Sequence, residues 1–539
     1  MSSKSITLSL VSKAVAVALN EGYQVSPDAV KLLQGYAEKK ARKDHQPSLD
    51  FIISEVLENK AKSKGVPSKT IVSEDLFRVF PDLFESGFLI KSEKKVVETI
   101  ITPSAFTESK VEKVKQENAV ESSLARITSE IEVIKDPSKQ VRPTGTEGFA
   151  QLFKNRYEKL NKIFQERPEG RQVVKIDKLN MDKGTAKISG LVFSKKPTKN
   201  GIEISIDDDS GRASVLALNE EVRRAAASVS LDQCVLLDVE AKQGRLILKN
   251  IIQPDVPSRV SSTSKKTVYA VFLSDLHIGS NKFLEGAFDR FILWLRGEWH
   301  NSGQKEDDEE IISKLKYVVI GGDVVDGVGV FPNQEYELAE NNIYKQYEMV
   351  AQKLSKFPEH LQMLVIPGNH DSTRQALPQP MIPEKYAGSL YKLKNLTMLG
   401  DPSVVRLHGV SILVYHGRSL DDVLATTPGL SYEEPAEAMK VLLRARHLAP
   451  MFGSRTPIAP EAEDHLVIEE VPDIFHAGHV HSIGVTTYKS TLIINSGTWQ
   501  AQTGYQANLG ITPSPGVVPI VNLATLDVVS REFLVSGFS

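Results

Sequence analysis

The chain contains very little cysteine, the residue that cross-links small secreted proteins, and very little tryptophan. Among its 539 residues there is one cysteine, Cys234, and there are three tryptophans. A single cysteine cannot form a disulfide within the chain, and it excludes a zinc site that is built from several thiolates. We therefore expect a cytoplasmic protein that is held together by packed cores.

Long apolar runs and an excess of one charge are also absent. No run of about 18 apolar residues occurs, so the sequence predicts no membrane span. The first segment, which ends at Gln24, lacks a strongly basic start and is interrupted by Lys13 and Asn20. We expect it to be an amphipathic helix of the mature protein rather than a secretory signal. The net charge is −3, so any surface that binds nucleic acid has to be local.

The length is too great for one core and predicts two to four domains. Residues 1–85 show apolar spacing close to 3.6 and the helix-start signal Ser26-Pro27, which together predict a small helical domain. Residues 86–145 are rich in Lys, Glu, Ser and Val and contain few aromatic residues, which is typical of a flexible linker.

Residues 146–257 predict a leading helix over 146–167, followed by short strands that are separated by turn signals such as Asn200-Gly201. Short strands with one helix before the last pair match a small β-barrel of the oligonucleotide-binding (OB) type. A β-sandwich is the alternative. Residues 258–267 are polar and predict a second linker.

From residue 268 the pattern changes to alternating strands and helices, and the strands are apolar throughout, as in a sheet that is covered on both faces. The charged stretch 301–310 is expected to be an exposed loop. Three of the strands end in Ser-Asp, Gly-Gly-Asp and Gly-Asn-His-Asp. Ligands of open α/β sheets gather at the carboxyl ends of strands, so these polar residues predict a site.

The polar residues at the strand ends combine carboxylate, imidazole and amide groups, which suit borderline-hard divalent metals. Their number is too large for one ion with an open position and suits two ions about 3.5–4 Å apart that share a carboxylate. The set is Asp275, His277, Asp323, Asn369, His370, His416, His479 and His481.

Four motifs in order carry a family resemblance: DLHIGS, GGDVVDG, PGNHD and GHVH. Together they resemble the calcineurin-like metallophosphoesterases, which include the Mre11-type nucleases, from Val268 to about Ser530. The resemblance implies a four-layered α/β/β/α domain over residues 268–539. The expected fold class is therefore multidomain α+β, with a helical domain, an OB barrel and this phosphoesterase domain.

A narrower resemblance rests on YHGRSLDD, RHLAPMFG, EEVPDIFHAGHVHSIG and NSGTWQAQT. With the barrel in front, these stretches are similar to the small subunits of archaeal family D DNA polymerases. That family implies a metal-dependent 3′→5′ exonuclease that proofreads DNA, located in the cytoplasm at the nucleoid. The implied partners are a large catalytic subunit and DNA, as single-stranded 3′ ends or primer–template. The sliding clamp is a further candidate partner, although no clamp-binding motif is evident.

The resemblance also implies roles for the site residues. Asp275, His277 and His481 would bind a first divalent ion, Asn369 and His479 a second, and Asp323 would bridge the two. His370 would act as the general acid. The metals would be Mn²⁺ in the first place, with Fe²⁺, Zn²⁺ or Mg²⁺ as alternatives that the same ligands accept.

Five further assignments complete this expectation. One more histidine would complete the second metal site, and the sequence leaves both His416 and His447 open. Asp326 and Asp371 are expected to fix imidazole tautomers by hydrogen bonding. Two candidate phosphate contacts are Arg418 and Arg446.

Two other functions remain as alternatives. One is a phosphatase or phosphodiesterase of the same fold that acts on small molecules. The fused barrel and helical domain argue against it, since a small-molecule enzyme has little need of them. The other is a catalytically silent scaffold for the large polymerase subunit, but all the motif residues are present in this chain.

Overall fold

The computed structural model describes residues 24–25, 70–71, 128–139, 145, 147–300, 303–508 and 510–534. The chain divides into two compact units, residues 1–109 and 110–539. In the first unit the structure describes a parallel pair of short strands, β1 (Gln24–Val25) and β2 (Thr70–Ile71). The predicted N-terminal helical domain otherwise lies outside the described residues.

The second unit contains a six-stranded sheet in the order β12-β11-β10-β9-β18-β19. Its strands β9 to β12 run parallel, and β18 joins β9 in the antiparallel sense. The strands are β9 (Tyr269–Leu273), β10 (Leu315–Ile320), β11 (Gln362–Val365), β12 (Leu396–Met398), β18 (Val517–Asn522) and β19 (Val528–Glu532).

A second six-stranded sheet has the order β16-β17-β15-β14-β13-β3. Strands β14, β15 and β17 are parallel to one another, while the outer pairings are antiparallel. The strands are β3 (Ile131–Lys135), β13 (Ser403–Leu407), β14 (Val410–Val414), β15 (Ile474–Ala477), β16 (Ile483–Tyr488) and β17 (Thr491–Ser496).

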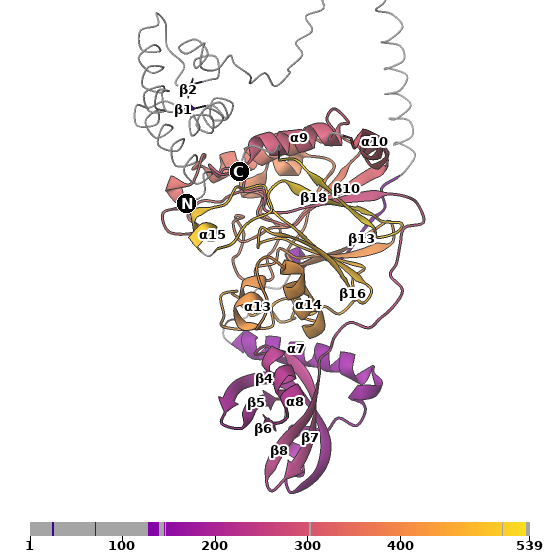
Figure 1. The fold of residues 1–539 in the computed structure, drawn as a ribbon, viewed down its shortest axis with the longest axis vertical. Coiled ribbons are helices and arrows are strands. Elements are labelled where there is room, and N and C mark those ends of the chain that lie inside the picture. The colour runs from indigo at the N-terminus through magenta and orange to yellow at the C-terminus, as the bar shows by residue number, and fades with distance from the viewer. Residues whose placement is uncertain are drawn as a thin grey trace, which may run out of the picture. The chain divides into compact units, whose positions relative to one another are not determined.

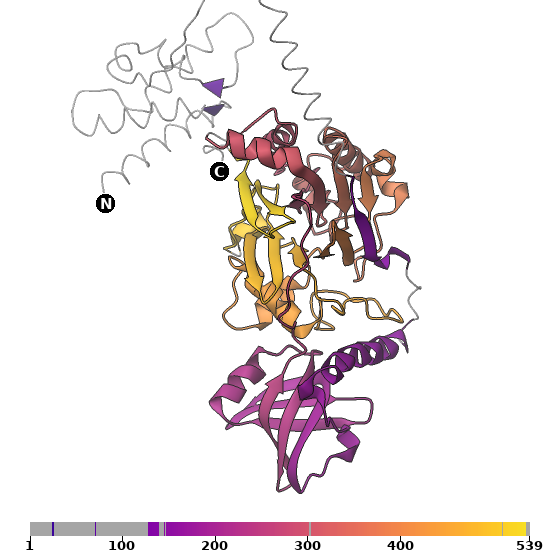
Figure 2. The same cartoon turned by 90° about the vertical axis from the view of Figure 1, so that its right-hand side faces the viewer.

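The two sheets pack against each other, and helices cover their outer faces (Figures 1 and 2). Phe272 and Val319 of the first sheet share one buried core with Ile412 of the second. The neighbouring strand residue Val271 points the other way, into a core with the helices, because side chains alternate along a strand. This alternation explains why the sequence of β9 is apolar at every position.

Helices α9 (Glu285–Leu295), α10 (Lys305–Lys314) and α11 (Ile343–Leu354) pack on the first sheet. Helices α13 (Leu420–Thr426) and α14 (Pro435–Ala445) pack on the second. Short helical turns occupy the connections: η4 (Gln334–Tyr336), α12 (Glu384–Ala387), η5 (Leu390–Lys392) and α15 (Gly504–Asn508).

The predicted barrel is present as a closed sheet in the order β4-β5-β6-β8-β7. Its core is a cluster of aliphatic residues that includes Ile188, Ile204 and Leu237. The strands are β4 (Lys183–Thr198), β5 (Gly201–Asp207), β6 (Arg212–Ala217), β7 (Cys234–Lys242) and β8 (Arg245–Ile252), and α8 (Glu220–Ser228) precedes the last pair. The leading helix is also present as α7 (Glu147–Gln165), followed by the turns η2 (Pro168–Gly170) and η3 (Ile176–Lys178).

Two stretches differ from the sequence-based expectation. Residues 131–139, expected in a flexible linker, form β3 and the turn η1 (Pro137–Lys139), and β3 extends the second sheet by pairing with β13. Part of the expected charged loop 301–310 belongs to helix α10, whose first turn is acidic, as the helix dipole favours. Local composition could not reveal either long-range contact.

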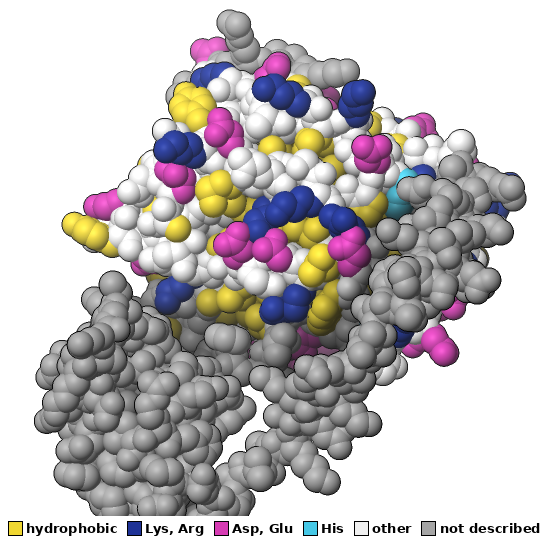
Figure 3. All heavy atoms as spheres, turned by 90° about the horizontal axis from the view of Figure 1, so that it is seen from above, with side chains coloured by type: hydrophobic (Ala, Val, Ile, Leu, Met, Phe, Trp, Pro, Cys, Tyr) yellow, Lys and Arg dark blue, Asp and Glu magenta, His cyan; other side chains and the backbone are white. Residues whose placement is uncertain are grey.

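The surface of the described part is mixed in charge. On the face drawn in Figure 3, basic and acidic side chains stand interspersed among apolar ones. Within the described ranges, no helix is long and apolar enough to cross a membrane.

Candidate metal centre

The predicted metal ligands stand on loops that directly follow five strands. Asp275 and His277 follow β9, Asp323 follows β10, Asn369 and His370 follow β11, His416 follows β14, and His479 and His481 follow β15. Because β9 to β11 are parallel and β14 is parallel to β15, each sheet presents its loops at one edge. The two edges meet, so residues that are far apart in the sequence come together.

The backbone at this site is strained. Five of the ligand candidates have left-handed φ angles: Asp275 at 53°, His277 at 48°, Asp323 at 50°, His479 at 72° and His481 at 61°. Residues other than glycine rarely adopt this conformation, and it clusters at functional sites where the surrounding structure enforces it.

Glycines allow the loops to approach the ligands closely. A Cβ atom on Gly368 would lie 2.2 Å from Asp323 Oδ1, and one on Gly478 would lie 2.4 Å from Asp275 Oδ2. Neither position can carry a larger residue unless the ligand carboxylates move.

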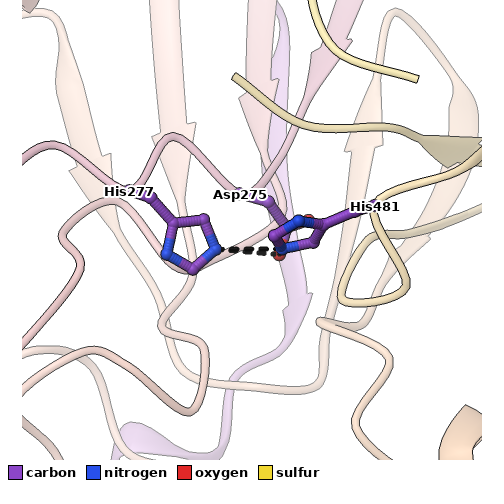
Figure 4. Close-up of side chains that lie close together, drawn as sticks. All are labelled: Asp275, His277 and His481. Atoms are coloured by element: carbon purple, nitrogen blue, oxygen red, sulfur yellow. Dashed lines mark hydrogen bonds and ion pairs between the residues drawn. The ribbon is translucent and has the colours of Figure 1, made fainter. Parts of the chain in front are cut away.

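Asp275, His277 and His481 form the first group of candidate ligands, and their side chains point toward one another (Figure 4). The Nε2 atoms of the two histidines are 3.0 Å apart. Asp275 Oδ1 lies 3.5 Å from His481 Nε2 and 3.9 Å from His277 Nε2. Within the part of the chain that the structure describes, this buried carboxylate oxygen has no hydrogen-bond partner. An orphaned buried oxygen facing two imidazole nitrogens fits a cation.

Asp323, His416 and His479 form an adjoining group. His416 Nε2 lies 3.3 Å from Asp323 Oδ2 and 3.0 Å from Asn369 Oδ1. Asp323 Oδ2 is also 3.9 Å from His277 Nε2 in the first group. The Asp323 carboxylate therefore lies between the two groups, at the position that a bridging ligand requires.

Neighbouring groups fix the orientation of the imidazole rings. Nδ1 of His277 lies 3.0 Å from Asp326 Oδ1, and Nδ1 of His416 lies 2.9 Å from the carbonyl oxygen of Gly321. Each bond sets the tautomer that leaves Nε2 facing the cluster. The expected contact of Asp326 with an imidazole is thus present.

Sequence reasoning missed two such partners. Asp421 Oδ2 lies 3.1 Å from His479 Nε2, and the side-chain amide of Gln506 contacts His481 Nδ1 at 2.8 Å. Asp421 falls in the motif YHGRSLDD, which offers a signal for it. Gln506 stands on α15, and only the folded chain brings it to the site.

Asp371 differs from its expected role. Its carboxylate accepts hydrogen bonds from the backbone N–H of Gly368 at 2.9 Å and of Val324 at 3.3 Å, and from the Tyr347 hydroxyl at 3.2 Å. It therefore ties the loop after β11 to the loop after β10. Burial, and next the charge of Asp323, raise the pKa of Asp371 to about 7.

Strong electrostatic coupling accompanies this burial. Burial disfavours the charged form of Asp275, but the proximity and charge of the His481 imidazole outweigh it and bring its pKa to about 2. Burial likewise disfavours a charged His416, yet the carboxylate of Asp323 raises the His416 pKa to about 10. A cluster that holds carboxylates charged in a buried place suits cation binding.

His370 lies at the edge of the same cluster. Its Nδ1 donates to the carbonyl oxygen of Asp326 at 2.7 Å, and its backbone N–H donates to Asp323 Oδ1 at 2.7 Å. The first bond leaves Nε2 as the ring nitrogen that is available for proton transfer.

Two candidates lie outside the cluster. The buried His447 bonds Asp464 at 3.0 Å, and Asp464 also pairs with Arg156 of α7. Between the two open histidines, the structure places His416 in the cluster. Arg446 is buried at the end of α14 and donates to the carbonyl oxygens of Ile468 and Glu469. Both side chains thus support loops.

An open cavity of about 780 Å³ lies over the cluster. His277, Asp323, His370 and His481 are among its lining residues, and so is Arg418. Arg418 donates to the backbone and side-chain oxygens of Gln375 at 2.8 and 3.0 Å.

Comparison with known proteins relates the sequence of this chain to a protein family. Residues 270–483 match the B-subunit family model of the DNA polymerases alpha and epsilon. The DNA polymerase II small subunit of Archaeoglobus fulgidus is 38% identical over 463 residues, which cover 84% of this chain and 90% of that protein. The counterpart from Pyrococcus furiosus is 44% identical over 389 residues, 71% of this chain but only 63% of that relative's length.

A solved archaeal phosphodiesterase aligns with 49% of this chain and 99% of its own length, at 11% identity and a TM-score of 0.23. The sequence relatives carry the assignment: the chain belongs to the family of archaeal DNA polymerase II small subunits, the family D polymerases that its motifs resemble.

Proposed function

We propose that the chain is the small subunit of a heteromeric archaeal DNA polymerase and that it removes nucleotides from DNA 3′ ends by metal-dependent hydrolysis. The observation that carries the proposal is the pair of adjoining ligand groups with Asp323 between them. Two-metal sites of this kind hydrolyse phosphodiesters by in-line displacement.

In this proposal Asp275, His277 and His481 hold one divalent ion. The second ion would be held by Asp323, His416 and His479 of the adjoining group, together with Asn369, whose Oδ1 lies 3.0 Å from His416 Nε2. When bound, two such ions supply Lewis-acid activation of water and neutralise charge on the phosphoryl oxygens. Mn²⁺ is the first candidate, and Fe²⁺, Zn²⁺ and Mg²⁺ are the alternatives.

The chain's own residues orient the substrate and handle the proton. His370 would protonate the leaving 3′-oxygen from Nε2, since Nδ1 is engaged by the Asp326 carbonyl. Asp326 and Asp421 would hold His277 and His479 in their ligating orientations. Arg418, which lines the cavity, would contact a substrate phosphate.

The remaining parts would join the subunit to its partners. We assign the barrel to the OB class, because its strand order β4-β5-β6-β8-β7 is that of a five-stranded Greek-key barrel. A large catalytic subunit and primer–template DNA are the proposed partners. The sliding clamp remains a further candidate.

The test uses purified chain, stripped of metal and reloaded with Mn²⁺, on single-stranded DNA labelled at its 5′ end. We expect a ladder of products shortened from the 3′ end. His370→Gln and Asp323→Asn should each reduce the rate by about 10²-fold or more. His360→Asn is the matched control, because His360 lies in the turn that precedes β11, at the end of the strand opposite the site.

Hydrolysis that survives Asp323→Asn would contradict the two-metal assignment. Absence of activity in the chain alone calls for the same assay with the large subunit added. Absence in the complex as well would leave the catalytically silent scaffold.

A further inference from the structure

Two exposed aromatic rings stand beside the metal centre, and none of the assigned roles uses them. Phe331, in the loop after β10, keeps 39% of its surface exposed, and Tyr505, on α15, keeps 68%. Both line the cavity of about 780 Å³ that contains the ligand residues. Exposed aromatic rings that line a cleft offer flat apolar faces to a ligand.

Phe331 stands in a loop whose backbone is tied to the site, although its own side chain is partly exposed. Its ring lies edge-to-face with the ring of His370, with centroids 6.3 Å apart. The buried side chain of Gln334 accepts from the backbone N–H of Val330 at 2.8 Å and donates to the carbonyl oxygen of Asp326 at 2.8 Å. The backbone of the loop next to Phe331 is therefore tied to Asp326, the residue that orients His277.

A second buried glutamine supports the same loop. Gln346 accepts from the backbone N–H of Gly327 at 2.9 Å and donates to its carbonyl oxygen at 3.1 Å. Buried amides are costly unless they are satisfied, so two of them bonded to the backbone of one short loop, one from within it and one from α11, indicate a loop with a required shape. This loop therefore places Phe331 at the wall of the cavity and not in a hydrophobic core.

Tyr505 is tied to the other side of the centre. The next residue, Gln506, contacts His481 Nδ1 at 2.8 Å. The same side chain accepts from the backbone N–H of Thr503 at 3.0 Å, which closes the start of α15. One ring therefore stands beside the proposed proton donor, and the other stands one residue from a contact to a proposed metal ligand.

From this arrangement, and resting on the proposed exonuclease function, we infer that Phe331 and Tyr505 stack on the unpaired bases of a single-stranded 3′ end. Stacking on aromatic rings tolerates any base, because every base has a π-face. A base that is paired in a duplex has to leave its partner before it reaches these rings. The cleft would thus prefer frayed, mismatched 3′ ends, and the stacking contact would not depend on the base sequence.

The test compares two substrates with each variant in the Mn²⁺-loaded, full-length chain. One oligonucleotide has ordinary bases throughout, and in the other the last two nucleotides are abasic. Phe331→Leu and Tyr505→Leu remove the rings but keep apolar side chains. Each should slow cleavage of the ordinary substrate by about five- to a hundredfold, as stacking strengths per base indicate, and leave the abasic substrate unchanged.

Two conservative variants and one control sharpen the result. Phe331→Tyr and Tyr505→Phe keep a ring and should keep the preference for ends with bases. Tyr344→Leu is the matched control, because Tyr344 is 51% exposed on α11 and is not among the residues that line the cavity. It should leave both substrates unaffected.

Binding provides a readout without catalysis. In chelator, an oligonucleotide that ends in 2-aminopurine should lose fluorescence when it stacks on the wild-type rings and should lose less with either leucine variant. Equal slowing on both substrates, or unchanged quenching, would overturn the stacking inference while the exonuclease proposal stands. A wild type that neither trims nor binds DNA, even with its large subunit, would defeat the proposed function itself.

Discussion

At the scale of single residues, the site separates two histidines that the sequence cannot rank. Both sit in motifs of the same family, and both are buried. His416 Nε2 faces Asp323 and Asn369, whereas His447 is engaged by Asp464. Strand-end topology favours His416 and sequence distance favours His447, so spatial position has to decide between them.

The different positions of His416 and His447 predict different numbers of bound metal ions in variants of the two residues. His416→Asn should reduce bound Mn²⁺ from about two equivalents to about one per chain, since it removes a ligand from the second group only. His447→Asn should retain both. Equilibrium dialysis followed by elemental analysis gives the counts directly. Equal loss in the two variants would show that the second ion is not held as assigned.

At the scale of elements, helix α10 shows why a charged stretch can be structural. Asp308 is fully buried, and its Oδ1 accepts from Arg531 Nε of β19 at 2.6 Å. The adjacent Asp307 is exposed. The acidic stretch therefore contains one buried, structurally paired carboxylate, Asp308, among exposed ones. Composition alone does not reveal which residue it is.

Replacement of Asp308 should lower the stability of the fold substantially. Asp308→Ala leaves the buried guanidinium of Arg531 without its partner and should lower the free energy of unfolding by about 3–5 kcal/mol. Asp307→Ala should change it by about 0.5 kcal/mol or less. Denaturation by urea, followed by circular dichroism, distinguishes the two. Similar small effects in both variants would show that α10 does not depend on this ion pair.

The same scale shows what sequence can and cannot predict. Period-two alternation and apolar runs predict the barrel and the strands that precede the ligands, because those signals are local. Strand β3 depends on pairing with the distant strand β13, in which Leu407 is the partner of Ile131, and the sequence of β3 is itself partly polar. Gln506 of α15 was missed for the same reason, since its contact with His481 exists only in the folded chain, whereas the motif YHGRSLDD offers a signal for Asp421 of α13.

At the scale of the whole molecule, buried neutral histidines link stability to pH. Burial, and next the charge of Arg156, lower the pKa of His447 to about 4, below its usual 6.5. Between these values the unfolded chain binds a proton that the folded chain does not. Stability is therefore fully present above pH 6.5 and falls as pH drops toward 4.

The pH dependence of stability can be measured on the wild type and on the variant His447→Gln. His447 alone should cost about 1.5 kcal/mol between pH 6.5 and pH 5, since the slope rises toward about 1.4 kcal/mol per pH unit only below pH 6.5. His447→Gln should be less stable than the wild type at pH 7.5 but should lose less on acidification. Urea unfolding at several pH values gives both slopes. Parallel slopes would contradict the depressed pKa of His447.

The left-handed backbone of five candidate ligand residues has a consequence for evolution and engineering. Each such residue costs about 1–2 kcal/mol of folding free energy relative to a relaxed backbone. A search for thermostable variants that ignores catalysis should therefore accumulate changes at these positions, because asparagine and glycine tolerate the conformation better. Stability and activity would be opposed at Asp275, His277, Asp323, His479 and His481, the positions that a designer has to hold fixed.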